Sequence, residues 1–82
     1  MLETMCLSDA PSNVILKILE INSDNDIRRK LLSMGIHPFD SLMKLSNSNY
    51  GAILIKNLTN GASKLAVGRV LAKKIIVDYD RN

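Results

Sequence analysis

Hydrophobic and polar positions alternate along most of this chain in short runs, and each run ends in a polar or glycine-containing turn. Residues 13–21 (NVILKILEI) are apolar at both alternating sets except Asn13, Lys17 and Glu20. A short apolar run rich in β-branched residues predicts a strand that is largely enclosed on both sides. Further runs of this kind predict strands at 41–45, 52–58, 64–67 and 75–79.

One segment has the spacing of a helix instead. Its apolar positions recur every three to four residues, so they would form one stripe along a helix surface. The members of this stripe are Ile27, Leu31 and Met34, with Leu32 at its edge. The pattern therefore predicts a helix over residues 25–34 that packs its stripe against the core.

The ends of this helix carry their own signals. Ser23 or Asp24 can accept a hydrogen bond from the free amides of the first turn. Gly35 stands where helices often end in a left-handed residue, and Pro38 follows shortly after it. Asp24 and Arg28 are four residues apart, which is the spacing of a surface ion pair on a helix.

Together these elements predict a mainly β fold. Five to six short strands, one early helix and a short helical turn near 68–74 suit a small, closed, strongly curved sheet. The 82 residues are enough for one domain, spanning 1–82, and not for two. Residues 1–6 are expected to form a disordered lead-in to this domain.

Composition excludes some classes of protein without selecting one. The net charge is +3, and a single cysteine, Cys6, allows no internal disulfide. The apolar runs are far shorter than the roughly 20 residues of a membrane span. The N-terminus lacks the basic start and apolar stretch of a secretory signal. A reducing, cytoplasmic environment without membrane insertion is therefore expected.

No group of residues in the sequence predicts a catalytic centre. Catalysis needs a nucleophile beside a base, or paired carboxylates in a cleft, and the only histidine is His37. His37, Cys6 and Asp40 could bind a metal, but they lack the spacing of known ligand sets. Met34 and Met43 are more simply explained as core residues. We expect no enzyme activity, no cofactor and no metal ligands.

Nucleic-acid binding by a small basic barrel is the main chemical alternative. Positive charge clusters at 28–30 and at 73–74. Proteins that bind single strands usually combine a basic groove with aromatic stacking platforms. The aromatic residues here are only Phe39, Tyr50 and Tyr79. The sequence favours a surface for another protein, with a nucleic-acid-binding or metal-sensing repressor-type domain as the alternatives.

Three segments, read in order, carry a family resemblance. They are IRRKLLSMGIHPFDSLMKL (27–45), AILIKNL (52–58) and GASKLAVGRVLAKKIIV (61–77). Their motifs and spacing resemble the FeoA family of small cytoplasmic partners of the ferrous iron transporter FeoB, over about residues 7–79. A similar fold occurs in the C-terminal domain of iron-dependent repressors of the DtxR type, behind DNA-binding and metal-binding parts that this chain lacks.

The resemblance implies an SH3-like barrel without enzyme activity. By that likeness, the protein would be an accessory or regulator of bacterial ferrous iron uptake that binds the cytoplasmic G-domain region of FeoB. The family supplies no catalytic, cofactor or metal residues to carry over. We expect the partner to contact the basic face of the helix and the corner after it, through Arg28, Arg29, Ile36, His37 and Phe39.

Two positions depart from the family pattern. Phe39 stands where the family usually has glycine, and because a non-glycine residue resists positive φ, a type I turn is expected at this corner. Asn13 replaces a glycine before the first predicted strand and tolerates left-handed geometry better than most residues. An exposed Phe39 would be a candidate anchor for a partner, whereas a buried one would fill the core.

Overall fold

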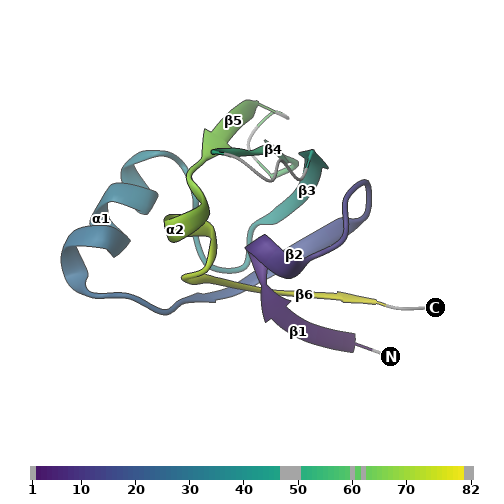
Figure 1. Cartoon of the computed structure of the whole chain (residues 1–82), viewed down its shortest axis with the longest axis horizontal. Coiled ribbons are helices and arrows are strands. Elements are labelled where there is room, and N and C mark those ends of the chain that lie inside the picture. The colour runs from purple at the N-terminus through teal and green to yellow at the C-terminus, as the bar shows by residue number, and fades with distance from the viewer. Residues whose placement is uncertain (1, 47–50, 60, 62, 81–82) are drawn as a thin grey trace.

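The six strands form one antiparallel sheet. The computed structural model of the chain describes residues 2–46, 51–59, 61 and 63–80 (Figure 1). Its elements are β1 (Leu2–Cys6), the 3₁₀ helix η1 (Leu7–Asp9), β2 (Ile15–Ile21), α1 (Asn25–Ser33), β3 (Ser41–Ser46), β4 (Ile53–Asn57), β5 (Lys64–Val67), α2 (Arg69–Ala72) and β6 (Ile75–Asp80). The strand order is β1-β6-β2-β3-β4-β5. The mainly β fold with one early helix and a short helical turn is confirmed.

The sheet curls around a single apolar core, with α1 to one side of it (Figure 1). Strands β2 to β6 all contribute buried apolar side chains, and η1, α1 and α2 add Leu7, Leu31 and Ala72. In β4 the residues are alternately buried and more exposed, as expected for a strand with one face on a core. The concave face of the sheet is therefore buried, and its convex face remains open to binding.

The two edge strands of the sheet are β1 and β5, and no ladder joins them in the part of the chain that the structure describes. Helix η1 follows β1 directly, and α2 closely follows β5. These two short helices lie in contact with each other. Packing between helices therefore brings the two ends of the curved sheet together, where the sequence suggested closure by strands alone.

The prediction of a disordered lead-in at residues 1–6 is wrong for residues 2–6, and residue 1 lies outside the described residues. Leu2–Cys6 forms β1, which pairs antiparallel with β6 from Leu2 opposite Asp80 to Cys6 opposite Ile76. Cys6 is half-buried in this strand and does not lie in a tail. Because the partner of β1 is the last strand of the chain, no local signal in the sequence announces the pairing.

Helix α1 agrees closely with its prediction. Asp24 is the N-cap, and its Oδ1 accepts a hydrogen bond from the Ile27 amide at 3.0 Å. Leu31 is fully buried, and Met34 packs against the core. Gly35 follows with φ of 88°, the left-handed geometry that glycine adopts without steric cost. These caps fix the point where the chain leaves the helix.

Lys44 of β3 is a fully buried lysine. Its Nζ donates hydrogen bonds to three backbone carbonyls in and after η1, namely Leu7 at 3.0 Å, Ser8 at 3.0 Å and Ala10 at 2.8 Å. A protonated ammonium has three N–H donors, so every donor has a partner. The bonds supply a donor to the Ser8 and Ala10 carbonyls, while the Leu7 carbonyl also accepts from the Ala10 amide at 3.2 Å. Lys44 thus ties the N-terminal segment to the middle of the sheet.

The cost of this arrangement is desolvation of a charge. Burial lowers the pKa of Lys44 below its ordinary value of 10.5. The positive charge of Arg69 lowers this pKa further, and the negative charge of Asp9 partly opposes both effects. The folded state therefore holds the Lys44 proton less tightly than the unfolded chain does.

Replacing Lys44 by methionine should lower the free energy of unfolding by about 3 kcal/mol, because the substitution leaves buried carbonyls without a donor. Urea unfolding followed by circular dichroism measures the change. The matched control is Lys56→Met on the opposite face of the neighbouring strand, where a change within about 0.5 kcal/mol is expected. Equal effects of the two substitutions would show that the three hydrogen bonds contribute nothing net.

The lowered pKa of Lys44 also predicts a pH dependence. Between this lowered value and 10.5, the unfolded chain binds a proton that the folded protein has released, so the free energy of unfolding should rise with pH. The titration of Lys44 can be followed through its ¹³Cε NMR signal, and stability through urea unfolding at each pH. A titration midpoint for Lys44 equal to those of the surface lysines would contradict the assignment.

Candidate protein-interaction surfaces

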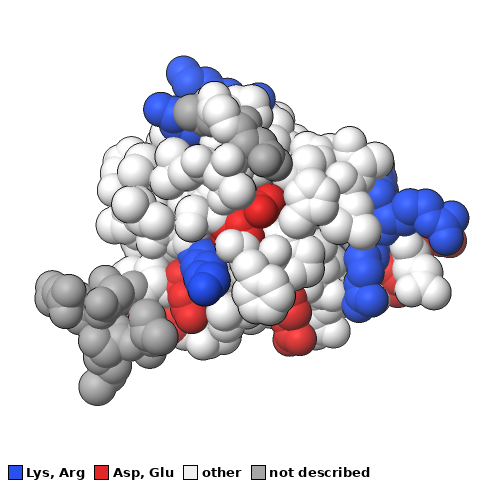
Figure 2. Space-filling model, turned by 180° about the vertical axis from the view of Figure 1, so that it is seen from behind, with Lys and Arg blue, Asp and Glu red and all other residues white. Residues whose placement is uncertain are grey.

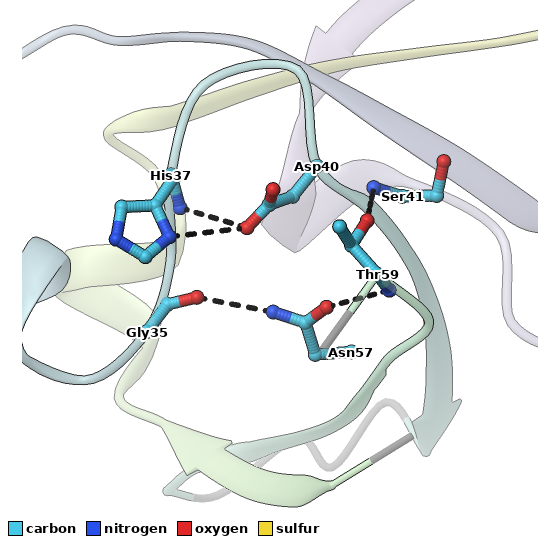
Figure 3. Close-up of polar contacts among 6 residues, drawn as sticks. All are labelled: Gly35, His37, Asp40, Ser41, Asn57 and Thr59. Carbon is cyan, nitrogen blue, oxygen red and sulfur yellow. Dashed lines mark hydrogen bonds and ion pairs between the residues drawn. The ribbon is translucent and has the colours of Figure 1, made fainter. Parts of the chain in front are cut away.

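The corner after α1 is fastened to the end of β4 by a buried asparagine (Figure 3). Asn57 is 4% exposed, and its Nδ2 donates to the Gly35 carbonyl at 3.0 Å. Its Oδ1 accepts from the Thr59 amide at 2.9 Å, and the Thr59 Oγ1 accepts from the Ser41 amide at 2.8 Å. These bonds fix both the start and the end of the corner at residues 35–41.

Asp40 holds the corner from the inside. Its side chain is almost buried, and its Oδ2 accepts a hydrogen bond from the His37 amide at 3.2 Å. The Nδ1 of the half-exposed His37 ring lies 3.3 Å from the same oxygen (Figure 3). The Asp40 amide in turn donates to the His37 carbonyl at 3.2 Å. The contacts between His37 and Asp40 therefore stabilise the turn. The pair alone supplies too few ligands for a metal site.

Phe39 projects from this corner and is 71% exposed. Its φ is 71°, so the prediction of a type I turn that avoids positive φ is wrong. The reason is that its amide donates to the Ile18 carbonyl at 2.7 Å while the bonds on both sides hold the neighbouring residues. The Lys17 ammonium lies 5.8 Å from the centre of the Phe39 ring, within the range of a cation–π contact. Asn13, with φ of 65°, adopts the left-handed geometry that was expected of it.

A shallow hollow of about 210 Å³ lies between β2 and α1, and Pro38, the residue before Phe39, is part of its lining. It is lined by Leu19, Glu20, Ile21, Arg28, Leu32 and Pro38. The Nη2 of Arg28 donates to the Ile21 carbonyl at 3.2 Å, and the described residues show no ion pair between Arg28 and Asp24. We call Leu19, Arg28, Leu32, Pro38 and Phe39 the corner surface.

The predicted partner-binding residues divide into two groups. Arg28, Arg29, His37 and Phe39 are exposed and available to a partner. Ile36 is fully buried, and its amide continues the helix end by donating to the Leu31 carbonyl at 3.0 Å. The expectation that the Ile36 side chain contacts a partner is therefore wrong, because it belongs to the core. The contact role of the other four residues remains a prediction.

The convex face of the sheet carries a second group of residues, which the sequence analysis missed. The strand registers place Ile15 opposite Met43, Met43 opposite Lys56, and Lys56 opposite Lys64. These four residues form a continuous line across β2, β3, β4 and β5, which we call the cross-strand row. None of them is buried, so the assignment of Met43 to the core is wrong.

The described residues, 2–46, 51–59, 61 and 63–80, hold no group of three or more His, Cys, Asp or Glu that could bind a metal ion. Within the same residues, no helix is both long and apolar enough to cross a membrane. The exposed features of the described chain are instead surfaces of mixed apolar and basic character.

Comparison with known proteins identifies the family to which this small barrel belongs. The FeoA domain family matches residues 5–79, and the chain belongs to that family. The crystal structure of an iron uptake regulatory protein (FeoA) is similar with a TM-score of 0.82 and 27% identity, over 92% of this chain and 96% of that one. The family resemblance and the SH3-like fold are both confirmed. No curated protein matches the sequence.

Other solved structures share the fold at lower identity. The NMR structure of a FeoA-like protein from Clostridium acetobutylicum has a TM-score of 0.78 and 20% identity, over 94% of this chain and 87% of that one. A manganese-dependent transcriptional repressor has a TM-score of 0.81 and 19% identity, over 94% of this chain but only 42% of the repressor. The repressor therefore shows the fold alone, as one part of a longer chain.

Replacing Phe39 by glycine should raise the free energy of unfolding by about 1 kcal/mol. Glycine removes the strain of positive φ, and little buried apolar area is lost from a ring this exposed. The control is Phe39→Ala, which removes the same ring but keeps the strain and should not stabilise the protein. Urea unfolding of both variants measures the difference. Equal stabilities of the two variants would mean that the left-handed backbone carries no strain.

Proposed function

We propose that this protein is a non-catalytic accessory or regulatory component of bacterial ferrous iron uptake. It acts in the cytoplasm by binding the cytoplasmic G-domain region of the FeoB transporter. Membership of the FeoA family, whose role is in ferrous iron transport, carries this proposal because the match extends over residues 5–79.

The corner surface is the part of the molecule best suited to this contact. Phe39 offers a large apolar side chain at a fixed position, and the adjacent hollow could receive an apolar side chain of the partner. Aromatic residues and arginine are enriched at the centres of protein interfaces. Because hydrogen bonds already order the corner, binding there loses little conformational entropy.

Arg28 adds a charged element to the same surface. One N–H of its guanidinium is engaged with the Ile21 carbonyl, and its other donors meet no acceptor within the described chain. A guanidinium can bind a carboxylate through two parallel hydrogen bonds. The corner surface should therefore favour a partner with an apolar side chain close to an acidic one.

The proposal predicts binding to the FeoB cytoplasmic domain of the same genome, measured by isothermal titration in the absence and presence of guanine nucleotides. Phe39→Ala should weaken the binding at least tenfold, because truncating a central aromatic anchor often costs more than about 1.4 kcal/mol. The matched control is Val70→Ala on α2. Val70 is an equally exposed apolar residue that does not belong to the corner surface. Its affinity should stay within twofold of the wild-type protein.

Two results would contradict the proposal, the first as a whole and the second in part. The first is no detectable binding by the wild-type protein in any nucleotide state. The second, which would reject the corner surface alone, is normal binding with equal effects of Phe39→Ala and Val70→Ala. Replacement of Arg28 by alanine gives an independent measure of the charged contact.

A further inference from the structure

The two lysines of the cross-strand row are placed in an unfavourable way for stability. Lys56 and Lys64 are direct partners on neighbouring strands, where like charges repel each other. The segments that form β3, β4 and β5 contain no acidic residue. Within the described chain, neither lysine side chain makes a hydrogen bond or an ion pair. An anionic group from outside would relieve the repulsion.

The other half of the row is apolar and also open. Ile15 is 63% exposed and lies directly opposite Met43. In the next line across the sheet, Leu54 is partly exposed opposite Ala66. Seen from behind, the molecule gathers basic side chains at the top, where β4 and β5 lie in Figure 1, and separately over α1, with mostly uncharged surface between them (Figure 2). The row is thus apolar at one end and basic at the other.

We propose that the cross-strand row binds an acidic, amphipathic segment of another protein. An apolar side chain of that segment packs on Ile15 and Met43, and two carboxylates approach Lys56 and Lys64. This surface lies on different residues from the corner surface, and the inference does not depend on binding to FeoB. It assigns the convex face of the sheet a partner chemistry of its own.

The spacing of the row defines the sequence pattern it fits. Strands lie about 4.8 Å apart, so Lys56 and Lys64 stand about 10 Å and 14 Å from Ile15. In an extended peptide, residues i, i+2 and i+4 point to one side at intervals of about 6.8 Å. An apolar residue placed over Ile15 and Met43 therefore brings acids at i+2 and i+4 close to the two lysines. The expected motif is an apolar residue followed by acids two and four positions later.

The partner is another protein and not a second copy of this chain. The chain does contain the motif, as Ile76, Asp78 and Asp80. These residues belong to β6, which is paired with β1 on one side and β2 on the other. A second copy could offer this segment only by breaking the middle of its own sheet. Nucleic acid is disfavoured because the row contains no aromatic side chain on which a base could stack.

The test is a titration of ¹⁵N-labelled protein with the peptide acetyl-GLTETEG-amide, followed by NMR. Amide shifts should change at residues 15, 43, 56 and 64, and the double variant Lys56→Glu, Lys64→Glu should bind at least tenfold more weakly. The matched control is Lys30→Glu, Lys73→Glu, which changes the charge equally at two exposed lysines elsewhere and should bind like the wild-type protein. The peptides acetyl-GLTQTQG-amide and acetyl-GATETEG-amide should each bind at least fivefold more weakly than the parent.

Loss of folding cannot imitate the expected result. Lys64→Glu alone places opposite charges across β4 and β5, so its urea unfolding midpoint should rise while its peptide affinity falls. Any of three outcomes overturns the proposal: no shift changes at the row with millimolar peptide, equal losses in the double variant and its control, or tighter binding of a thymidine oligonucleotide at the same residues. In each case the FeoB experiment can still succeed, because it is read at the corner surface.

Discussion

The ammonium group of Lys44 is the contact on which the arrangement of this small barrel depends. It lies inside the sheet and binds three carbonyls of the chain around η1. Without it the Ser8 and Ala10 carbonyls would lose their donor, and without the carbonyls the charge would be buried without acceptors. The ammonium supplies donors to the carbonyls, and the carbonyls supply acceptors to the ammonium. Because η1 follows β1 and touches α2, this one side chain also fixes how the two ends of the sheet meet.

A buried charge of this kind specifies geometry as well as contributing to stability. Hydrophobic side chains of similar size could fill the same space, but they would not prescribe where the N-terminal turn must sit. Three directional hydrogen bonds prescribe it. The corner at residues 35–41 follows the same logic, since Asn57 and Asp40 hold a backbone shape that Phe39 alone would not favour. In both places hydrogen bonds of buried polar groups fix the position of the backbone. At the corner, they hold the Phe39 ring exposed to solvent.

Local patterns in the sequence predicted most of the elements but not their contacts. Helix α1 and most strands could be predicted, because apolar spacing and capping residues act within a few positions. Strand β1 could not, since the strand it pairs with in the described chain is β6, far away in the sequence. In SLMKL the natural choice is to point lysine outward and Met43 inward. The structure has the opposite phase, with Leu42 and Lys44 buried, because the carbonyls of η1 supply what a buried ammonium needs.

Because the buried and exposed residues of β3 are the reverse of those expected, the candidate surfaces could be predicted only in part from the sequence. Exposing Met43 aligns it with Ile15 and Lys56, and the row exists only through registers that join four strands. Arg28 could be named beforehand because it stands on a helix face, where exposure follows from local structure, whereas the sequence left the exposure of Phe39 open. The same barrel occurs within longer repressors, so the fold itself does not decide the function. What distinguishes this chain is the side chains on the surfaces that the core leaves free, and Lys44 determines which residues of β3 those are.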